Sequence, residues 1–359
     1  MKVAVYAIAL NEEAFVSRWA ESCADADYRI ILDTGSTDAT MPTAMTAGVD
    51  VFRARFDPWR FDTARNNSLS LVPKDADLCI ALDMDEVLLP GWREHLHKAW
   101  AFGVTRPRYR YVWSWEGNKP GLVYGGDKVH SRHGYEWKHP VHEVLTATGI
   151  DEVQAWSGME IHHHPDPRKS RSQYLPLLRL AVEEDPFDDR NCHYLARELM
   201  FAGLNEEAEE MFRQHLGLDR AVWKPERAAS MRYLYKLTGK VSWLDAAVAE
   251  CPERREAWVD LARHQYEEAD WHGCLRSATA ALRITERPLE YLTEAFAWGA
   301  LPHDLAAIAA YRCGYWAQAA FHGMAALRID PYDARLVSNL SFYSSALQVF
   351  GEQQNKSTK

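Results

Sequence analysis

Three acids, Asp83, Asp85 and Glu86, follow directly on an apolar run at 78–82. Such a run predicts a buried strand, and the carboxyl ends of strands are where open α/β sheets bind ligands. Asp83 and Asp85 are two residues apart, so in an extended chain their carboxylates share a face. Two oxygen ligands of this kind suit Mg²⁺ or Mn²⁺ with a phosphate as a further ligand. The alternative is an acidic turn exposed to water.

The elements expected around this cluster alternate between strand and helix over about the first 85 residues. Strands are expected at 3–10, 28–32, 49–54 and 78–82, with helices at about 13–22, from 39 and at about 63–71. This order predicts a parallel sheet with helices on both faces. Asp33 follows the second strand as Asp83 follows the fourth, so both acids are expected at one edge.

The usual phosphate-binding loops are missing from this sequence. No Gly-x-Gly-x-x-Gly follows the first strand, and no Gly-Lys-Ser/Thr loop occurs. If phosphates bind at this edge, a metal ion must therefore neutralise much of their charge.

Four short motifs resemble, in the same order, those of family-two glycosyltransferases of the GT-A fold. They are Asn-Glu-Glu at 11–13, Asp-Thr-Gly-Ser-Thr-Asp-Ala-Thr at 33–40, Phe-Asp-Thr-Ala-Arg-Asn at 61–66 and Leu-Asp-Met-Asp-Glu at 82–86. The branch that the chain looks most like contains bacterial lipopolysaccharide-type and peptide S-glycosyltransferases. The resemblance covers residues 1 to about 166 and implies a Rossmann-like, mostly parallel GT-A domain that uses a nucleoside diphosphate sugar.

The resemblance also implies roles for individual residues. The donor-binding residues would be Asn11, Glu12, Asp33, Gly35, Ser36, Arg65 and Asp83. Asp33 would hold the base and ribose, Asp83 would serve ribose and metal, and Asp85 would be the surer metal ligand. Arg65 would lie close to the diphosphate, and an ion pair with Asp62 on a helix surface is the equal alternative.

Arginines alternate with other residues along a strand expected at 104–115, at Arg106, Arg108 and Arg110. Alternation of this kind predicts a strand with one basic face. We favour a solvated edge strand. The alternative is a groove for the acceptor, with aromatic residues for stacking.

The stretches 128–132 and 135–143 resemble the acceptor half of the same branch, in which a His-Glu pair recurs. An inverting transfer needs one carboxylate to take the proton of the acceptor as it attacks the anomeric carbon. We expect Glu143 to be this catalytic base, with Asp127 as the second candidate.

Three consecutive histidines, His162, His163 and His164, precede Pro165. On a strand the first and third face one way and the second faces the other. The branch carries an Ile-x-His pattern here, which matches His163 and implies that it closes on the metal. A histidine of the core or of the acceptor site is the alternative.

From about residue 167 the pattern is helical, and the helix pairs look like tetratricopeptide repeats. Ala196, Ala229 and Ala262 fall on a period of about 34 residues, which then slips because 287–299 inserts an extra helix. Such an array presents a concave surface. We expect a GT-A domain at 1–166, all-α repeats at 167–350 and a frayed polar tail at 351–359.

Composition restricts the class of protein. The 359 residues are 47% hydrophobic and carry a net charge of −10, which does not favour nucleic acid held by a general basic field. The six cysteines form no Cys-x-x-Cys, which suits reduced thiols in the cytosol. No apolar run approaches about 18 residues, and the first ten residues are too short for a signal peptide. We expect a cytoplasmic protein without a membrane span.

The sequence therefore predicts a metal-dependent, inverting glycosyltransferase that uses Mn²⁺ or Mg²⁺ and a nucleotide-diphosphate sugar. The acceptor is unidentified, and could be a glycan, a peptide or a modified nucleobase in DNA. The net negative charge of the chain disfavours a DNA acceptor, which would need several contacts to phosphates. The helical repeats would dock the acceptor or form a homodimer. An interaction scaffold with an inactive transferase domain is the alternative, against which the presence of both Asp83 and Asp85 weighs.

Overall fold

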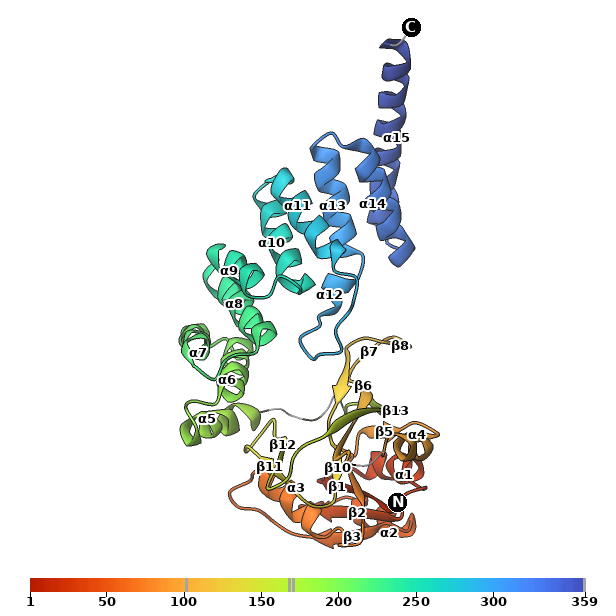
Figure 1. The fold of residues 1–359 in the computed structure, drawn as a ribbon, viewed down its shortest axis with the longest axis vertical. Coiled ribbons are helices and arrows are strands. Elements are labelled where there is room, and N and C mark those ends of the chain that lie inside the picture. The colour runs from red at the N-terminus through yellow and green to blue at the C-terminus, as the bar shows by residue number, and fades with distance from the viewer. Residues whose placement is uncertain (101–102, 167–168, 170–171, 358–359) are drawn as a thin grey trace. The chain divides into compact units, whose positions relative to one another are not determined.

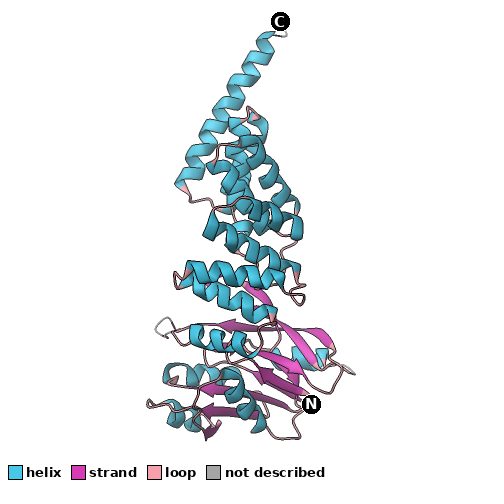
Figure 2. Cartoon of the chain, turned by 90° about the vertical axis from the view of Figure 1, so that its left-hand side faces the viewer, coloured by secondary structure: helices cyan, strands magenta, loops and turns pink. Residues whose placement is uncertain are grey.

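The computed structural model describes residues 1–100, 103–166, 169 and 172–357, and it divides into two compact units, Met1–Pro186 and Phe187–Lys359. The described strands all belong to the first unit, and the second is helical (Figures 1 and 2). The boundary expected between 166 and 167 touches residues 167 and 168, which lie outside the described residues. Helix α5 (Tyr174–Glu184) belongs to the first unit.

The main sheet of the first unit has the strand order β10-β4-β1-β2-β3 (Figure 1). Strand β1 pairs in parallel with β2 and β4, β2 pairs in parallel with β3, and β10 is antiparallel to β4. The bounds are β1 (Val3–Ala9), β2 (Tyr28–Asp33), β3 (Asp50–Arg53), β4 (Leu78–Ala81) and β10 (Val129–Ser131). This is the mostly parallel α/β sheet that the sequence predicts, and it brings the carboxyl ends of β1, β2 and β4 to one edge.

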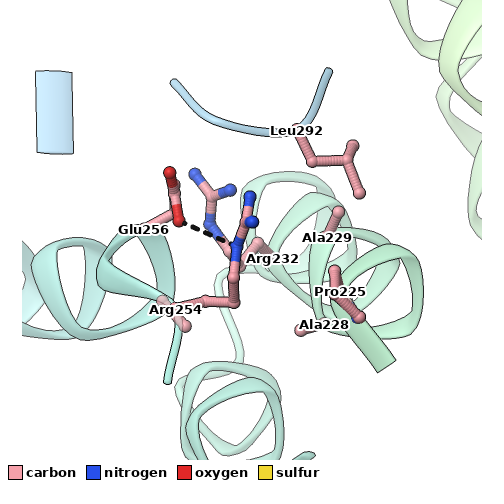
Figure 3. A pocket seen from close by; sticks show the side chains of 8 residues that line it. Pro225, Ala228, Ala229, Arg232, Arg254, Glu256 and Leu292 are labelled. Carbon is pink, nitrogen blue, oxygen red and sulfur yellow. Dashed lines mark ion pairs between the residues drawn. The ribbon is translucent and has the colours of Figure 1, made fainter. Parts of the chain in front are cut away.

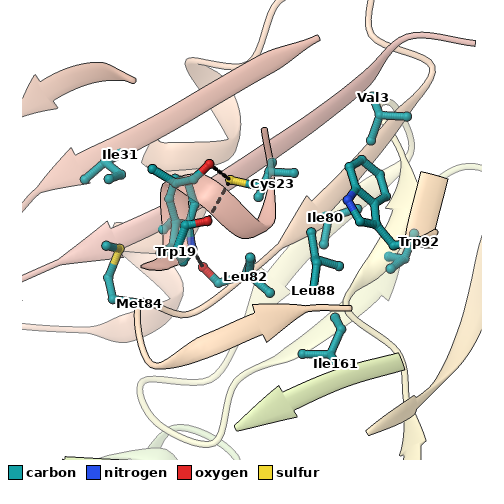
Figure 4. Packing of buried hydrophobic residues seen from close by; sticks show 14 of the residues in the cluster. Val3, Trp19, Cys23, Ile31, Ile80, Leu82, Met84, Leu88, Trp92 and Ile161 are labelled. Atoms are coloured by element: carbon teal, nitrogen blue, oxygen red, sulfur yellow. Dashed lines mark hydrogen bonds between the residues drawn. The ribbon is translucent and has the colours of Figure 1, made fainter. Parts of the chain in front are cut away.

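Helices α1 (Glu13–Ser22), α2 (Thr40–Thr46) and α3 (Phe61–Ser70) connect these strands. On α1 the fully buried Trp19 donates its indole N–H to the carbonyl of Leu82 at 3.0 Å (Figure 4). Leu82 and Met84 are buried in the same cluster. Helix α1 therefore fixes the chain at the end of β4, on both sides of Asp83.

A second sheet has the order β5-β13-β6-β9, in which β13 is parallel to β6 and the outer pairs are antiparallel. Its strands are β5 (Glu86–Leu88), β6 (Arg106–Val112), β9 (Val123–Gly126) and β13 (Gln154–His163). The remaining elements of the unit are α4 (Trp92–Ala99) and two hairpins, β7 (Trp115–Glu116) with β8 (Lys119–Pro120) and β11 (Tyr135–Lys138) with β12 (Val144–Ala147).

The prediction of an edge strand with a free basic face is wrong for β6, which lies between β13 and β9. Arg106 bonds to Glu152 at 2.7 Å and to the carbonyls of Asp127 and Leu145. Arg108 bonds to the carbonyls of Gly125 and Gly126, and Arg110 pairs with Glu160 at 2.5 Å. These arginines bond to carbonyls and carboxylates of neighbouring strands and loops. They therefore offer no basic groove to an acceptor.

In the second unit, consecutive helices pack in pairs: α6 with α7, α8 with α9, α10 with α11, and α13 with α14. The bounds are α6 (Asp189–Phe201), α7 (Asn205–Gly217), α8 (Lys224–Thr238), α9 (Ser242–Glu250), α10 (Arg255–Glu267), α11 (Trp271–Arg283), α12 (Ala295–Trp298), α13 (Leu301–Arg312), α14 (Trp316–Ile329) and α15 (Ala334–Ser357). The short α12 is the extra helix expected within 287–299.

Helix α15 extends to Ser357, into the segment expected from residue 351 as a polar tail. Residues 358 and 359 lie outside the described residues. Within the described parts of the chain, no helix combines the length and the apolar character needed to cross a membrane.

The close approach of β6 and β9 generates a test of the second sheet. A Cβ at Gly126 would lie 2.1 Å from the ring of Tyr109, its cross-strand partner, which is 1% exposed. We expect Gly126→Ala to lower the free energy of unfolding by about 1–3 kcal/mol, since the ring must move within a packed core. Calorimetric unfolding checks this. Gly217→Ala in α7, where a Cβ meets nothing within 4 Å, is the control and should cost nothing.

Candidate active site

The loops after β1 and β2 are bound to each other at the carboxyl edge of the main sheet. The backbone N–H of Asn11 donates to the hydroxyl of Ser36 at 2.8 Å, and Asn11 Oδ1 accepts from the N–H of Thr37 at 2.8 Å. Asn11 has φ +56°, a conformation that asparagine tolerates better than most residues. The first two motifs thus form one surface.

The buried carboxylate of Asp33 holds the loop after β2 in place through backbone hydrogen bonds. Its carboxylate is 0% exposed and accepts from the backbone N–H groups of Gly35 and Ser36, each at 3.1 Å, with Arg53 Nε at 3.4 Å. Gly35 has φ +130°, which favours glycine. The structure therefore places the predicted donor-binding acid beneath the loop, and the loop itself, at Gly35 and Thr37, reaches the surface.

Asp83, after β4, lies between two cations. Its Oδ1 accepts from Arg65 Nη2 at 2.7 Å and its Oδ2 from Lys128 Nζ at 2.6 Å. Burial alone would raise the pKa of this carboxyl group, but Arg65 and Lys128 hold the pKa well below its usual range. Asp83 is therefore ionised, and both of its oxygens are engaged.

Arg65 does not pair with Asp62, so that alternative is wrong. Asp62 pairs with Arg60 at 2.8 Å. Arg65 is 6% exposed, donates through Nε to Glu143 as well as to Asp83, and lies 5.0 Å from the ring of Trp137. It shares the buried face of α3 with Ser68 one turn later, which explains why it points inward.

Two residues of this cluster, Glu86 and Lys128, were not assigned a role from the sequence. Glu86 is 0% exposed and accepts from Lys128 Nζ at 2.9 Å, from the Tyr111 hydroxyl and from the N–H of Asp83 at 2.9 Å. Burial lowers the pKa of Lys128, but Asp83 and Glu86 raise it well above its usual value. Lys128 reaches Asp83 because β10 runs antiparallel to β4, a pairing that has no signal in the local sequence.

His163 is the one of the three consecutive histidines that reaches the acids. Strand β13 pairs with β5 so that His163 lies opposite Glu86, and the N–H of His164 donates to the Asp85 carbonyl at 2.8 Å. His163 Nε2 then lies 3.5 Å from Asp85 Oδ2. The side chain of His162 contacts Glu160, and that of His164 stacks on Trp115.

The hydrogen bond made by Nδ1 of His163 determines the tautomer of the ring, and therefore whether Nε2 presents a lone pair to Asp85. His163 Nδ1 lies 2.8 Å from the carbonyl of Trp113, and a carbonyl only accepts, so Nδ1 carries the proton. Metal-binding histidines are commonly oriented in this way. Burial lowers the pKa of His163, but Asp85 and the Trp113 carbonyl raise it overall. A cation shared with Asp85, whether a proton or a metal ion, is thus favoured.

The donor set fits a divalent metal that is completed by substrate. Among the described residues, no group of three or more His, Cys, Asp or Glu side chains is arranged to hold a metal ion. Asp83 faces its two cations, which leaves Asp85 and His163 as the pair. Mg²⁺ and Mn²⁺ sites often take one or two protein ligands and fill the rest with water and substrate phosphates.

Glu12 brings a further acid to this edge. It is 6% exposed, and its Oε1 pairs with Lys169. Burial raises the pKa of Glu12, Lys169 opposes the rise, and the charges of Asp85 and Asp83 add to it. Its Oε2 is buried with no hydrogen-bond partner among the described residues. Such an acceptor is suited to a ligand hydroxyl.

The two candidates for the catalytic base differ in their surroundings. The Glu143 side chain is 11% exposed and joins Asp83 through Arg65. Asp127 is exposed, and its described contact is through its carbonyl, which accepts from Arg106. The structure thus brings Glu143, and not the Asp127 side chain, into the charged cluster.

A surface hollow of about 630 Å³ is bordered by His164, the residue whose backbone N–H donates to the Asp85 carbonyl. Phe15, Trp115 and His164 line it with rings, and Arg18 and Asn118 add polar groups. The described contact of the Arg18 guanidinium is with the Phe15 ring, at 5.4 Å. Volume and lining are those of a site for a small molecule or a single residue.

No protein-family model and no curated protein matches this sequence. Among solved structures, glucosyl-3-phosphoglycerate synthase from Mycobacterium tuberculosis, in complex with Mn²⁺, uridine diphosphate and phosphoglyceric acid, is similar with a TM-score of 0.34 and 19% identity, over 46% of this chain and 72% of that chain. A thermophilic TPR protein of Thermus thermophilus is similar with a TM-score of 0.31 and 18% identity, over 48% of this chain and 89% of that chain. Likenesses at this level transfer no activity or substrate to this chain.

Proposed function

We propose that the first unit is a glycosyltransferase domain that moves a sugar from a nucleoside diphosphate to an acceptor on a glycan, a peptide or a modified nucleobase, with inversion at the anomeric carbon. One observation carries this proposal: Asp85 and His163 face each other at the carboxyl edge of a parallel sheet, beside the cations Arg65 and Lys128. Ligands of α/β sheets bind at this edge. The motif resemblance supplies the reaction class and its stereochemistry.

Asp85 and His163 would hold a Mn²⁺ or Mg²⁺ ion. When bound, the ion would supply positive charge to the diphosphate that leaves as the sugar is transferred. The loops at 11–12 and 33–36 would receive the nucleoside. Asp33 and Asn11 keep those loops in place, and Glu12 Oε2 offers an acceptor to a ribose hydroxyl.

Arg65 and Lys128 would bind the phosphates by exchanging partners. Both now contact the Asp83 carboxylate, an anion that a phosphate oxygen can replace. Their desolvation has already occurred on folding, so the exchange retains most of its interaction energy. Asp83 would then be free to accept from a ribose hydroxyl or to join the metal ligands.

Glu143 would take the proton of the acceptor. In this step the acceptor oxygen or nitrogen forms a bond to the anomeric carbon, the bond to the diphosphate breaks, and the proton moves to the Glu143 carboxylate. The hollow lined by Phe15, Trp115 and His164 would hold the acceptor. Its size and rings suit a sugar, a peptide side chain or a nucleobase. The hypothesis of a DNA acceptor loses the one feature that supported it, because the arginines of β6 bond to neighbouring segments of the same unit.

The metal pair generates the first test. Calorimetric titration of UDP, GDP and ADP, with and without Mn²⁺, should find one nucleotide whose binding needs the metal. Asp85→Asn should weaken that binding by at least about tenfold, because loss of a ligand costs no less than loss of its supporting partner. Asp151→Asn, an exposed acid of the same unit, is the matched control and should bind like wild type.

Equal affinity with and without Mn²⁺, or equal behaviour of the two variants, would contradict the metal site. If no nucleotide binds under any condition, the transferase proposal fails. The second unit, as an interaction scaffold, would then be the functional part of the chain.

The shared cation generates the second test. Lys128→Met leaves Asp83 and Glu86 without the ammonium group that they share. We expect the free energy of unfolding to fall by about 2–4 kcal/mol, because the buried Glu86 and the partly buried Asp83 lose a partner. Nucleotide binding should weaken as well. Lys119→Met on the exposed β8 hairpin is the control, and an equal loss in both variants would exclude a special role for Lys128.

A further inference from the structure

Residues 284–299, which we call the strap, make a detour in the second unit. They connect α11 to α13, yet these two helices pack directly against each other. The link between α9 and α10, by comparison, needs only residues 251–254. Outside the short α12 the strap has no regular structure, and it lies across helices that precede it in the chain. Its course is therefore determined by what it contacts and not by the need to join α11 to α13.

Two carboxylates fasten the strap to buried arginines. Glu290 pairs with Arg254 at 2.6 Å, and Glu294 pairs with Arg232 at 2.5 Å. Both arginines are almost fully buried, at 5% and 3% exposure. Arg232 is on α8 and Arg254 immediately precedes α10. The acids are four residues apart, and the strap meets one arginine from each of two helix pairs.

Apolar and aromatic contacts lie between these two ion pairs. Tyr291 stacks on Tyr194 of α6, with ring centroids 5.9 Å apart, contacts Trp223 and donates its hydroxyl to Glu226. Leu292, 6% exposed, faces Pro225 and Ala229 of α8 (Figure 3). The helices thus offer a seat for an extended segment with the order acid, aromatic, apolar and acid. We define this seat by Tyr194, Trp223, Glu226, Arg232 and Arg254.

The strap does not fill its seat completely. A cavity of about 10 Å³ remains beneath it, lined by Arg232, Arg254 and Glu256 (Figure 3). Among the described residues, Arg232 Nη2 and Glu256 Oε2 have no hydrogen-bond partner, although Glu256 lies 3.3 Å from Arg254 as an ion pair. A space of this size accommodates one water molecule at most. The seat therefore has hydrogen-bonding capacity that the strap does not use.

Between residues 290 and 294 the strap is held by two ion pairs and by the buried Leu292 and Thr293, while Ala297 of α12 belongs to the core cluster shared with α10, α11 and α13. Buried ion pairs roughly balance their desolvation cost, so the two Arg–Glu pairs specify position more than they add net stability. Arg232 also bonds to Asp260, and Arg254 forms an ion pair with Glu256 at 3.3 Å, so both cations keep a carboxylate when the strap is absent. The outer part of the strap, including Glu286 and Leu289, is exposed.

We propose that the seat is a docking surface for an extended acidic segment of a partner protein, and that the strap occupies it in the free protein. The partner segment would place an aromatic residue between two carboxylates, as Glu290, Tyr291 and Glu294 do. Charge complementarity selects this chemistry, because Arg232 and Arg254 each accept a second carboxylate in addition to Asp260 and Glu256. Binding would exchange one set of carboxylates for another.

The strap sequence itself provides the probe. A fluorescein-labelled peptide of residues 284–299 is titrated into the full chain and followed by anisotropy. Against wild type, the double variant Glu290→Gln/Glu294→Gln should bind the peptide about tenfold more tightly or better, since its own strap has lost both carboxylates. A peptide with the same two glutamines should bind that variant about tenfold more weakly. No donor or metal is present, so the result is independent of sugar transfer.

Glu286→Gln, which changes an exposed acid of the same strap, is the matched control and should behave like wild type. The proposal is overturned if the double variant binds the peptide no better than this control. It is also overturned if the double variant loses its helical circular dichroism, because the strap is then a fixed part of the fold. Concentration-dependent dimers of the double variant would assign the seat to a second copy of this chain instead of a partner.

Discussion

The candidate site depends on the sharing of two cations, the buried Arg65 and the partly buried Lys128, among three carboxylates. Arg65 and Lys128 serve Asp83, Glu86 and Glu143, which come from the end of β4, the start of β5 and the loop before β12. A buried charge that loses its partner is costly, so none of these elements can move alone. The acids outnumber the cations, and Asp85 and Glu12 lie beside them, so the edge of the sheet attracts a cation before it can receive a diphosphate.

Local sequence predicts those features that depend on pattern and on general rules of topology. The apolar runs at 3–10, 28–32 and 78–82 become β1, β2 and β4, and parallel pairing then brings Asp33, Asp83 and Asp85 to one edge. The position of His163 beside Asp85 follows from the motif resemblance and not from spacing, because the two residues are far apart in the chain. The role of Asp33 shows the limit: its place is predictable, but the direction of its carboxylate depends on the turn that Gly35 permits.

The predictions that were wrong have a common physical cause. Whether a charged side chain can be buried depends on its hydrogen-bond and ion-pair partners, and the local sequence does not show these partners. Arg106, Arg108 and Arg110 have the alternation of an exposed strand, yet carbonyls and acids of neighbouring segments bind their guanidinium groups, and Arg106 is buried. Lys128 and Glu86 look like surface residues for the same reason. Their partners come from strands joined by antiparallel pairing of β10 with β4, and long-range pairing of this kind leaves no periodic signal in either segment.

The same physics governs the two places where this chain is suited to exchange a ligand. At the edge of the first unit, Arg65 and Lys128 contact Asp83, and in the second unit Arg232 and Arg254 contact the acids of the strap. In both, the cost of desolvating the arginine or lysine is incurred on folding, whether or not a ligand is present. Replacing one anion by another then changes the free energy by only the difference between two similar interactions. Buried cations that hold internal carboxylates therefore keep a site folded and charged while leaving it open to an anionic ligand of matching shape.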